Sequence, residues 1–313
     1  RERTKNSYES MSGILIDYTE DKYKKMSVGA FTNRHAQACL DYLVMQRRTR
    51  AGKRLTNKTY NAYLNLMKGI WDILISREYV IRNPWAGFKE KKVKEKVARD
   101  YSHDELRIIV RRVGQRDKYL LLAMTLLYYC FIRPTELTRL RVRNLRIKDS
   151  RILLSGLITK NGKNRSPTIP DVIKYFIKSF DFDSFDSNAY VFGRKAKRSK
   201  VITTCVDWPV SYKVFNNRLK KIIQNLHEEG ALPDIRGMIF YGLKDTGATD
   251  LIEQGVNAYE LMNQIGHSSL SETQTYLMKK KKVIQAVKEH ETDILAFTDL
   301  PSQERPQSND ETQ

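Results

Sequence analysis

Four side chains in the last two thirds of the sequence could act together on an anionic group. Residues 131–137 read FIRPTEL and contain Arg133, and residues 159–163 read TKNGK and contain Lys160. Further on, His267 follows a glycine, and Tyr276 stands nine positions after that histidine. Arginine, lysine and histidine supply cationic hydrogen-bond donors, and a tyrosine hydroxyl can serve as a nucleophile. Such a set suits chemistry at a phosphate, where fixed cations stabilise charge that develops on oxygen.

The order of these residues resembles the tyrosine recombinase family, which includes the integrases of phages and conjugative elements. That family has an arginine before Glu-Leu, a lysine on a hairpin, a box on a helix, a Gly-His pair and a tyrosine, in this order. The separation of His267 from Tyr276 is the habitual one. The resemblance covers about residues 27–285 and is loosest in the helical N-terminal part. Each motif is short, but the order and spacing together are specific.

The resemblance implies a role in DNA cleavage and rejoining for each of these side chains. Tyr276 would attack the phosphodiester and form a 3′-phosphotyrosine, while Lys160 would protonate the leaving 5′ oxygen as general acid. Arg133 would bind two phosphate oxygens with its planar guanidinium, His267 would donate to the phosphate, and Glu136 would orient Arg133. The covalent intermediate conserves bond energy, so we expect neither a metal nor ATP nor any other cofactor.

The second box of the family departs from its usual His-x-x-Arg-His here. The matching residues are Tyr241, Lys244 and Asp245. Lys244 keeps the positive charge but is a point donor instead of a fork, and Tyr241 still offers one hydroxyl. Asp245 would at most orient its neighbours. Arg236 would stand eight residues too early and before the helix begins, so we reject it as the second arginine. The variant set is compatible with a working site and also with reduced activity.

Plainer interpretations compete with this one. Most of the 17 tyrosines must be packing residues, so Tyr276 stands out only through its order with the others. Lys163 flanks the same turn as Lys160 and remains an alternative general acid, and Lys244 could be an ordinary solvated helix lysine. At the level of function, the alternatives are a DNA-binding protein of this fold without cleavage, a type IB topoisomerase, and a metal-dependent nuclease or transposase. For the last of these, the acidic residues show no recognisable arrangement.

Composition favours a nucleic-acid partner. The 313 residues carry a formal net charge of +20, with a sequence pI near 9.7. A protein this basic binds polyanions, and nucleic acid is the first candidate. No apolar run approaches the roughly 18–20 residues of a membrane span. The three cysteines contain no CxxC pair, which fits a reducing compartment, and we expect a bacterial cytoplasm with association to the nucleoid.

The pattern of elements predicts a mainly α protein with a small antiparallel β-sheet. Ser102 and Glu105 form a capping box, Thr56 or Asn57 can cap a helix, and Asn161-Gly162 is a strong hairpin turn between predicted strands. We predict strands at 145–147, 151–158 and 165–169. A helix is expected over 241–253, ended by Gly255, and the next helix is capped by Asn257.

We expect a two-domain clamp around DNA. The segments are an N-terminal extension without assigned structure that links to a missing upstream module (1–26), a helical core-binding domain of SAM-like type (27–88), a charged linker (89–99), a catalytic domain (100–285), and a C-terminal helix with a partly disordered acidic tail (286–313).

The expected partner is double-stranded DNA at attachment sites, with no membrane. Basic side chains that we expect to contact phosphates are Arg47, Arg48, Arg50, Lys53, Lys58, Lys68, Lys163, Arg165, Lys213, Lys220 and Lys221. A weak apolar stripe after the tyrosine, at Ile284, Val287, Ile294 and Leu295, suggests assembly. From the resemblance we expect a homotetramer on DNA, with a monomer permitted in its absence.

Overall fold

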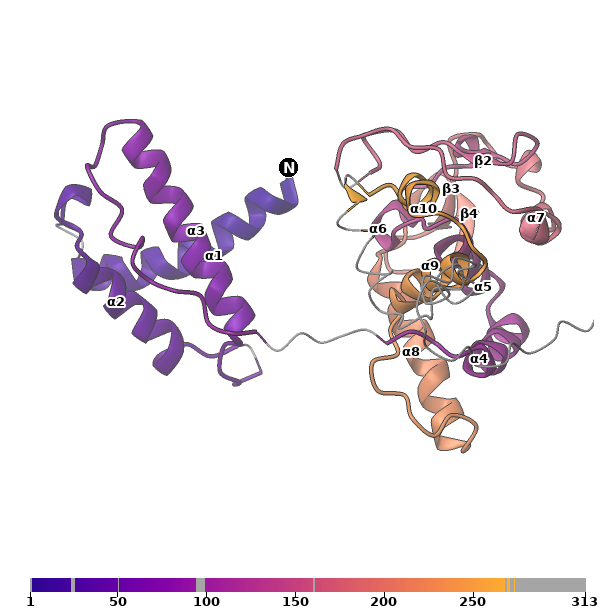
Figure 1. Ribbon diagram of the computed structural model, residues 1–313, viewed down its shortest axis with the longest axis horizontal. Helices are drawn as coiled ribbons and strands as arrows, with labels where there is room; N and C mark the ends of the chain where they lie inside the picture. The colour runs from indigo at the N-terminus through magenta and orange to yellow at the C-terminus, as the bar shows by residue number, and fades with distance from the viewer. Residues whose placement is uncertain are drawn as a thin grey trace, which may run out of the picture. The chain divides into compact units, whose positions relative to one another are not determined.

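The computed structural model describes residues 2–23, 26–49, 51–93, 99–159, 161–267, 269–270 and 273. Within these residues the chain is mainly helical with two small antiparallel sheets (Figure 1), which confirms the predicted fold class. The chain forms two compact units, residues 1–96 and 97–313, and the division falls inside the charged segment predicted as a linker. No helix in the described ranges is both long and apolar enough to cross a bilayer.

The first unit is built from α1 (Glu2–Tyr23), α2 (Asn33–Asp41) and α3 (Asn57–Ser76), with a 3-10 turn at Val28–Ala30 and a π-helical turn at Tyr42–Gln46. The sequence left residues 1–26 unassigned, but α1 occupies most of them and packs against α2 and α3. The ring of Tyr18 on α1 stacks on Tyr42 at 4.4 Å between centroids. The core of this unit consists of Ala36, Cys39, Leu40, Leu43, Tyr60, Tyr63, Leu64, Leu66, Met67 and Trp85.

The chain that follows α3 returns along this helix. Thr56 caps α3 by accepting a hydrogen bond from the backbone of Thr59. After the helix ends, Asn83 donates to the carbonyl of Lys68, and the indole of Trp85 is buried. Asparagine side chains of α3 also donate to the backbone carbonyls of Lys91 and Lys92. The return segment, residues 77–93, is therefore packed onto α3 as part of the first unit.

In the second unit, α5 (Lys118–Tyr129) is the central helix. α4 (His103–Arg116), α8 (Lys213–Glu228) and α9 (Gly242–Glu253) all pack against it, and Figure 1 shows α9 beside α5. A Cβ atom at Gly247 of α9 would lie 2.2 Å from the carbonyl oxygen of Tyr128 on α5. Only glycine permits such a close approach of the two helices. The capping box at the start of α4 is confirmed, with Ser102 and Glu105 bonding to each other's backbone N–H.

Two sheets and several short helices complete this unit. β1 (Leu145–Arg146) pairs with β2 (Arg151–Ile152), and isolated bridges continue the ladder to residues 165–168. The predicted hairpin is therefore present, with Gly162 in the left-handed region at φ +76°, although its regular strands are shorter than predicted. A second sheet, which was not predicted, consists of β3 (Tyr190–Arg194), β4 (Thr203–Cys205) and β5 (Trp208–Pro209) in the order β4-β3-β5. The remaining elements are α6 (Pro134–Leu137), α7 (Asp171–Lys178), α10 (Ala258–Ile265) and 3-10 turns at Val142–Asn144 and Phe182–Ser184.

Candidate active site

A strained turn at the end of α5 presents Arg133. Phe131 has φ +55° and is fully buried. A bulky residue rarely adopts this left-handed conformation, so the surrounding structure must hold it there. Its ring packs with Ala248, Leu261 and Ile265 of α9 and α10. The turn redirects the chain into α6, with Arg133 as the residue before its first turn.

Arg133 is fixed by two acceptors from different parts of the chain. Its Nη1 donates to Glu136 Oε1 at 3.2 Å, and its Nη2 donates to the carbonyl oxygen of Gly266 at 3.3 Å. The backbone N–H of Arg133 also donates to Glu136 Oε2 at 2.8 Å. Glu136 has no exposed surface. A buried carboxylate with cationic and backbone donors around it is a rigid brace for the arginine.

Lys244 is buried on α9 next to this pair. The residue is only 1% exposed, so it is not the solvated helix lysine of the competing interpretation. Burial, with further contributions from Arg133 and Arg165, lowers the pKa of Lys244 to about 8. Its Nζ lies 5.7 Å from the ring centroid of Tyr241, and among the described residues no side chain or carbonyl accepts a hydrogen bond from it. The ammonium is thus a donor held beside Arg133.

Tyr241 lies just before α9, at the rim of the same cluster. It is 38% exposed. Burial of its inner part and the nearby carboxylate of Asp245 raise the pKa of Tyr241, while Arg133 opposes the shift by charge and by a side-chain hydrogen bond. The phenol therefore keeps its proton at neutral pH and can donate a hydrogen bond. Asp245 is half-buried one residue after Lys244.

α10 places the Gly266-His267 pair. Asn257 caps the helix by accepting from the backbone of Glu260, as predicted, and Gly266 ends it at φ +72°. His267 is half-buried, and its Nδ1 lies 3.0 Å from the hydroxyl oxygen of Thr273, which has no exposed surface. This contact with a buried hydroxyl restrains the imidazole ring.

The structure describes only part of the predicted catalytic set. Arg133, Tyr241, Lys244 and the turn before His267 come together, whereas Lys160 and Tyr276 lie outside the described residues. So do Arg50 and the apolar stripe at 284–295. At the tip of the hairpin Lys163 is exposed, and its carbonyl accepts a hydrogen bond of 2.8 Å from Thr159.

Arg165 and Lys68 do not lie where we expected phosphate contacts. The Arg165 side chain is 8% exposed and donates to Glu136 Oε2 at 2.6 Å, so it lies beneath the cluster. Lys68 is half-buried and donates to the carbonyl of Phe88 at 2.7 Å, which ties α3 to the return segment. We predicted surface positions for both residues from their charge alone, and the charge of a side chain does not indicate whether it is buried. Among the other described candidates for phosphate contacts, Arg47 is half-buried. The rest are exposed, namely Arg48, Lys53, Lys58, Lys163, Lys213, Lys220 and Lys221.

The buried position of Arg165 and the contact of Thr273 with His267 were not predicted from the sequence. Arg165 shares a strand face with Ile169, which is buried, and its bridge partner Leu154 is buried too. The two-residue alternation of a strand could have placed this arginine inward. Thr273 stands six residues after His267, and no pattern singles it out. Arg236, rejected on spacing, is paired with Asp234, with its side chain 90% exposed.

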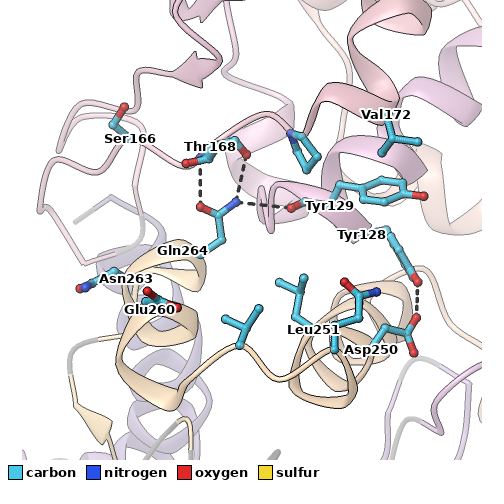
Figure 2. A pocket seen from close by; sticks show the side chains of 14 residues that line it. Tyr128, Tyr129, Ser166, Thr168, Val172, Asp250, Leu251, Glu260, Asn263 and Gln264 are labelled. Atoms are coloured by element: carbon cyan, nitrogen blue, oxygen red, sulfur yellow. Dashed lines mark hydrogen bonds between the residues drawn. The ribbon is translucent and has the colours of Figure 1, made fainter. Parts of the chain in front are cut away.

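A pocket of about 790 Å³ lies on another side of α10 and contains none of the catalytic candidates. Figure 2 shows Gln264 crossing its wall, where the side chain accepts from the backbone of Thr168 and donates to the carbonyls of Thr168 and Tyr129. Gln264 thereby ties α10 to the strand after the hairpin and to the end of α5. Among the described residues no group of three or more His, Cys, Asp or Glu side chains could hold a metal ion.

Comparisons with known proteins show the family of the chain. Residues 100–282 match the phage integrase family. The chain is 24% identical over 276 residues to the tyrosine recombinase XerA of Pyrococcus horikoshii, covering 88% of this chain and 83% of that protein. It is 21% identical over 231 residues to the tyrosine recombinase XerC of Lactobacillus leichmannii, covering 72% and 73%.

Solved structures share the fold. The Tn1549 transposon integrase in complex with circular intermediate DNA superposes with a TM-score of 0.63 at 14% identity, covering 92% of each chain. A lambda integrase tetramer bound to a Holliday junction superposes with a TM-score of 0.60 at 16% identity, covering 87% of this chain and 73% of that one.

Proposed function

We propose that this chain, which belongs to the phage integrase family, is a site-specific DNA recombinase that cleaves and rejoins DNA through a 3′-phosphotyrosine at Tyr276. Integration or excision of a mobile element is the role we assign to it. The observation that carries the proposal is the convergence of Arg133 and Lys244 beside the Gly266-His267 turn, around a buried glutamate. These two cations come from the two boxes that the family uses to bind the scissile phosphate.

The proposed reaction exchanges one phosphodiester for another. The Tyr276 oxygen attacks phosphorus, the bond from phosphorus to the 5′ oxygen breaks, and the leaving oxygen takes a proton from Lys160. Rejoining is the reverse, with a 5′ hydroxyl attacking the phosphotyrosine. Bond energy is conserved, so the mechanism requires neither a metal nor ATP. Lys163 remains the alternative donor of the proton.

The cluster would stabilise the transition state by charge and by hydrogen bonds. Arg133 is held in place before any substrate arrives, so its fork would meet the charge that develops on the non-bridging oxygens without reorganisation. Lys244 would supply a second positive charge as a point donor, and the protonated Tyr241 hydroxyl a third hydrogen bond. His267 would donate a further hydrogen bond to the phosphate. The variant box therefore keeps charge and donors but loses one fork.

DNA is the proposed partner, with four protomers acting together. The two solved structures above that share the fold hold DNA, and one of them is a tetramer on a Holliday junction. Lys213, Lys220 and Lys221 of α8 are exposed, as a phosphate-contacting surface requires. Affinity for duplex DNA should fall steeply with salt, because each neutralised phosphate releases counterions. We propose a tetramer on DNA and leave a monomer as the species without it.

One assay tests the proposed chemistry. The protein is incubated in EDTA with nicked duplex that carries its attachment site, and covalent adducts are separated on denaturing gels. We expect an adduct that disappears in Tyr276→Phe and persists in Tyr259→Phe, a control tyrosine that is 62% exposed on α10. Specific binding without any adduct would favour the DNA-binding alternative, and cleavage only with magnesium would favour a nuclease. Relaxation of supercoiled DNA without sequence preference would indicate a topoisomerase.

A further inference from the structure

Arg165 is the most heavily bonded side chain beneath the active-site cluster. Its Nη2 donates to Glu136 Oε2 at 2.6 Å and to the carbonyl of Phe131 at 3.0 Å, and its Nη1 donates to the carbonyl of Gln264 at 3.3 Å. The guanidinium thus bonds to α6, to the strained turn after α5 and to α10. A planar fork with five donors can hold three such acceptors at fixed angles, and a lysine cannot.

The strand that carries Arg165 belongs to the predicted catalytic hairpin. The backbone N–H and carbonyl of Arg165 both bond to Leu154, at 2.9 Å each. Three residues further on, Thr168 bonds to the side chain of Gln264 in both directions (Figure 2). The hairpin is therefore clamped to α10 at two points, once through the Arg165 guanidinium and once through Gln264.

The stem of Arg165 also accounts for a glycine beside the catalytic histidine. A Cβ atom on Gly266 would lie 2.6 Å from Arg165 Cδ. Gly266 in turn offers its carbonyl to Arg133 Nη2. Arg165 therefore packs directly under the peptide that both binds Arg133 and leads into His267.

Neither DNA contact nor stability explains this arrangement well. A guanidinium that is 8% exposed and bonded to three protein acceptors has no free face for a phosphate. Buried ion pairs contribute little net stability, because the cost of removing both charges from water offsets their attraction. In the described part of the chain, the Nε of Arg165 is buried without a partner, which is a further cost. Positioning of the neighbouring side chains is the function that remains.

We propose that Arg165 is a positioning residue, which aligns Arg133, the Gly266-His267 turn and the catalytic hairpin around one phosphate. Through Glu136 it shares a carboxylate with Arg133, so a shift of either guanidinium moves the other. The inference rests on the proposed recombinase chemistry but assigns Arg165 no contact with DNA.

The test separates positioning from DNA contact. For Arg165→Lys we expect unchanged affinity for the attachment site, an unchanged salt dependence, and a cleavage rate at saturating DNA that falls about 100-fold, because small misplacements of reacting groups cost rates of that order. Lys163→Gln, at the exposed hairpin tip, should instead weaken binding and lower the salt slope by about one. Arg107→Gln, on the exposed face of α4, is the control for loss of an arginine and should behave as wild type.

A second pair of variants displaces Arg165 without touching its charge. Gly266→Ala would drive a methyl into the Arg165 stem, and Gly255→Ala has the same left-handed backbone penalty with nothing within 4 Å. We expect Gly266→Ala to reproduce the loss of cleavage and Gly255→Ala to retain the wild-type rate. Thermal unfolding of both variants shows whether they fold.

The outcomes are distinguishable. If wild-type protein gives no tyrosine adduct, the proposed function fails and this inference falls with it. If wild-type protein cleaves and Arg165→Lys cleaves equally fast at saturating DNA, only the inference is overturned. A loss of affinity and salt slope in Arg165→Lys would return Arg165 to the phosphate-contacting set and would also overturn it. Should Arg165→Lys not fold, equal cleavage by the two glycine variants would contradict the proposal.

Discussion

Arg133 Nη2 donates a hydrogen bond of 3.3 Å to the carbonyl oxygen of Gly266. The bond joins the first arginine motif to the peptide immediately before His267, across 133 positions of the chain. The orientation of the guanidinium and the path of the backbone into the histidine therefore depend on each other. Disturbance on one side of this bond should be felt in the chemistry of the other.

Glu136→Gln tests the brace under Arg133. The amide keeps the shape of the side chain but turns one acceptor into a donor that faces a guanidinium group, so we expect a loss of about 3 kcal/mol in the free energy of unfolding. Cleavage at saturating DNA should fall by about 100-fold. The control is Glu105→Gln, which breaks a similar pair with Arg99 outside the site. It should lose stability while it cleaves normally, and equal cleavage defects in both variants would contradict a specific role for Glu136.

The charge on Lys244 should set the alkaline limit of activity. With its pKa near 8, Lys244 loses its proton as the pH rises through that value. We expect the single-turnover cleavage rate at subsaturating DNA to decline above about pH 8. Lys244→Arg should retain some cleavage and keep it to higher pH, since arginine stays protonated, and Lys244→Ala should abolish cleavage. Wild-type rates in the alanine variant would disprove the role of Lys244.

The same lysine should oppose folding. Its pKa is about 8 when folded, against 10.5 for an unperturbed lysine. The unfolded chain therefore holds more protons between these values, and stability rises with pH across that window. Below about pH 8 the full cost of the buried ammonium is present. Lys244→Met should raise the free energy of unfolding by about 1–3 kcal/mol at pH 7, measured with urea, and this gain should shrink towards pH 10. A destabilised Met variant would refute this reading.

Thr273 should act through the imidazole of His267. Thr273→Val keeps the volume but removes the hydroxyl 3.0 Å from Nδ1, so the ring loses a contact with a buried group. We expect cleavage to be about 10-fold slower, because removal of a group that hydrogen-bonds to the second ring nitrogen of a functional histidine typically lowers activity by that order. Thr273→Ser keeps a hydroxyl and should cleave at close to the wild-type rate. Similar rates for the valine and serine variants would rule out the contact as a determinant of activity.

The close approach of α9 to α5 at Gly247 predicts how substitutions there change the stability of the second unit. Gly247→Ala would force α9 away from the backbone of α5, and we expect a loss of about 2 kcal/mol or more in the free energy of unfolding. Gly114→Ala on α4 meets only the side chain of Leu121 at an ordinary 3.7 Å, so it should stabilise by about 0.5–1 kcal/mol through helix propensity. Urea titrations of both variants make the comparison, and equal effects would show that the close approach is unimportant.

Local sequence patterns predicted the helix caps and turns near the site better than they predicted how its side chains are arranged. The cap at Asn257 and the left-handed Gly255 have the structure expected from the sequence, because caps and turns depend mainly on neighbouring residues. The sheet β4-β3-β5 was missed because its strands have two to five residues, too few for an alternation to be visible. α1 was missed because its apolar residues show no clear stripe.

The burial of two charged side chains, Lys244 and Arg165, was not predicted from the sequence. Lys244 and Arg165 look like surface cations in the sequence, since nearly all lysines and arginines are. Both are enclosed because elements far apart in the chain meet around Glu136, and spacing along the chain does not encode such a meeting. The family order identified Lys244 as a candidate for the site, whereas Arg165 was expected at the DNA surface, and only strand alternation could have indicated that it is buried.

The contact between Gly247 and Tyr128 also bears on the substrate. α5 leads into the turn that carries Arg133, and α9 carries Lys244 one helical turn before that glycine. The anchoring points of the two cations are therefore spaced by main-chain atoms in direct contact. In the proposed reaction, a phosphate bound by Arg133 and Lys244 would therefore lie between groups whose spacing depends on how closely the backbones of α5 and α9 approach each other.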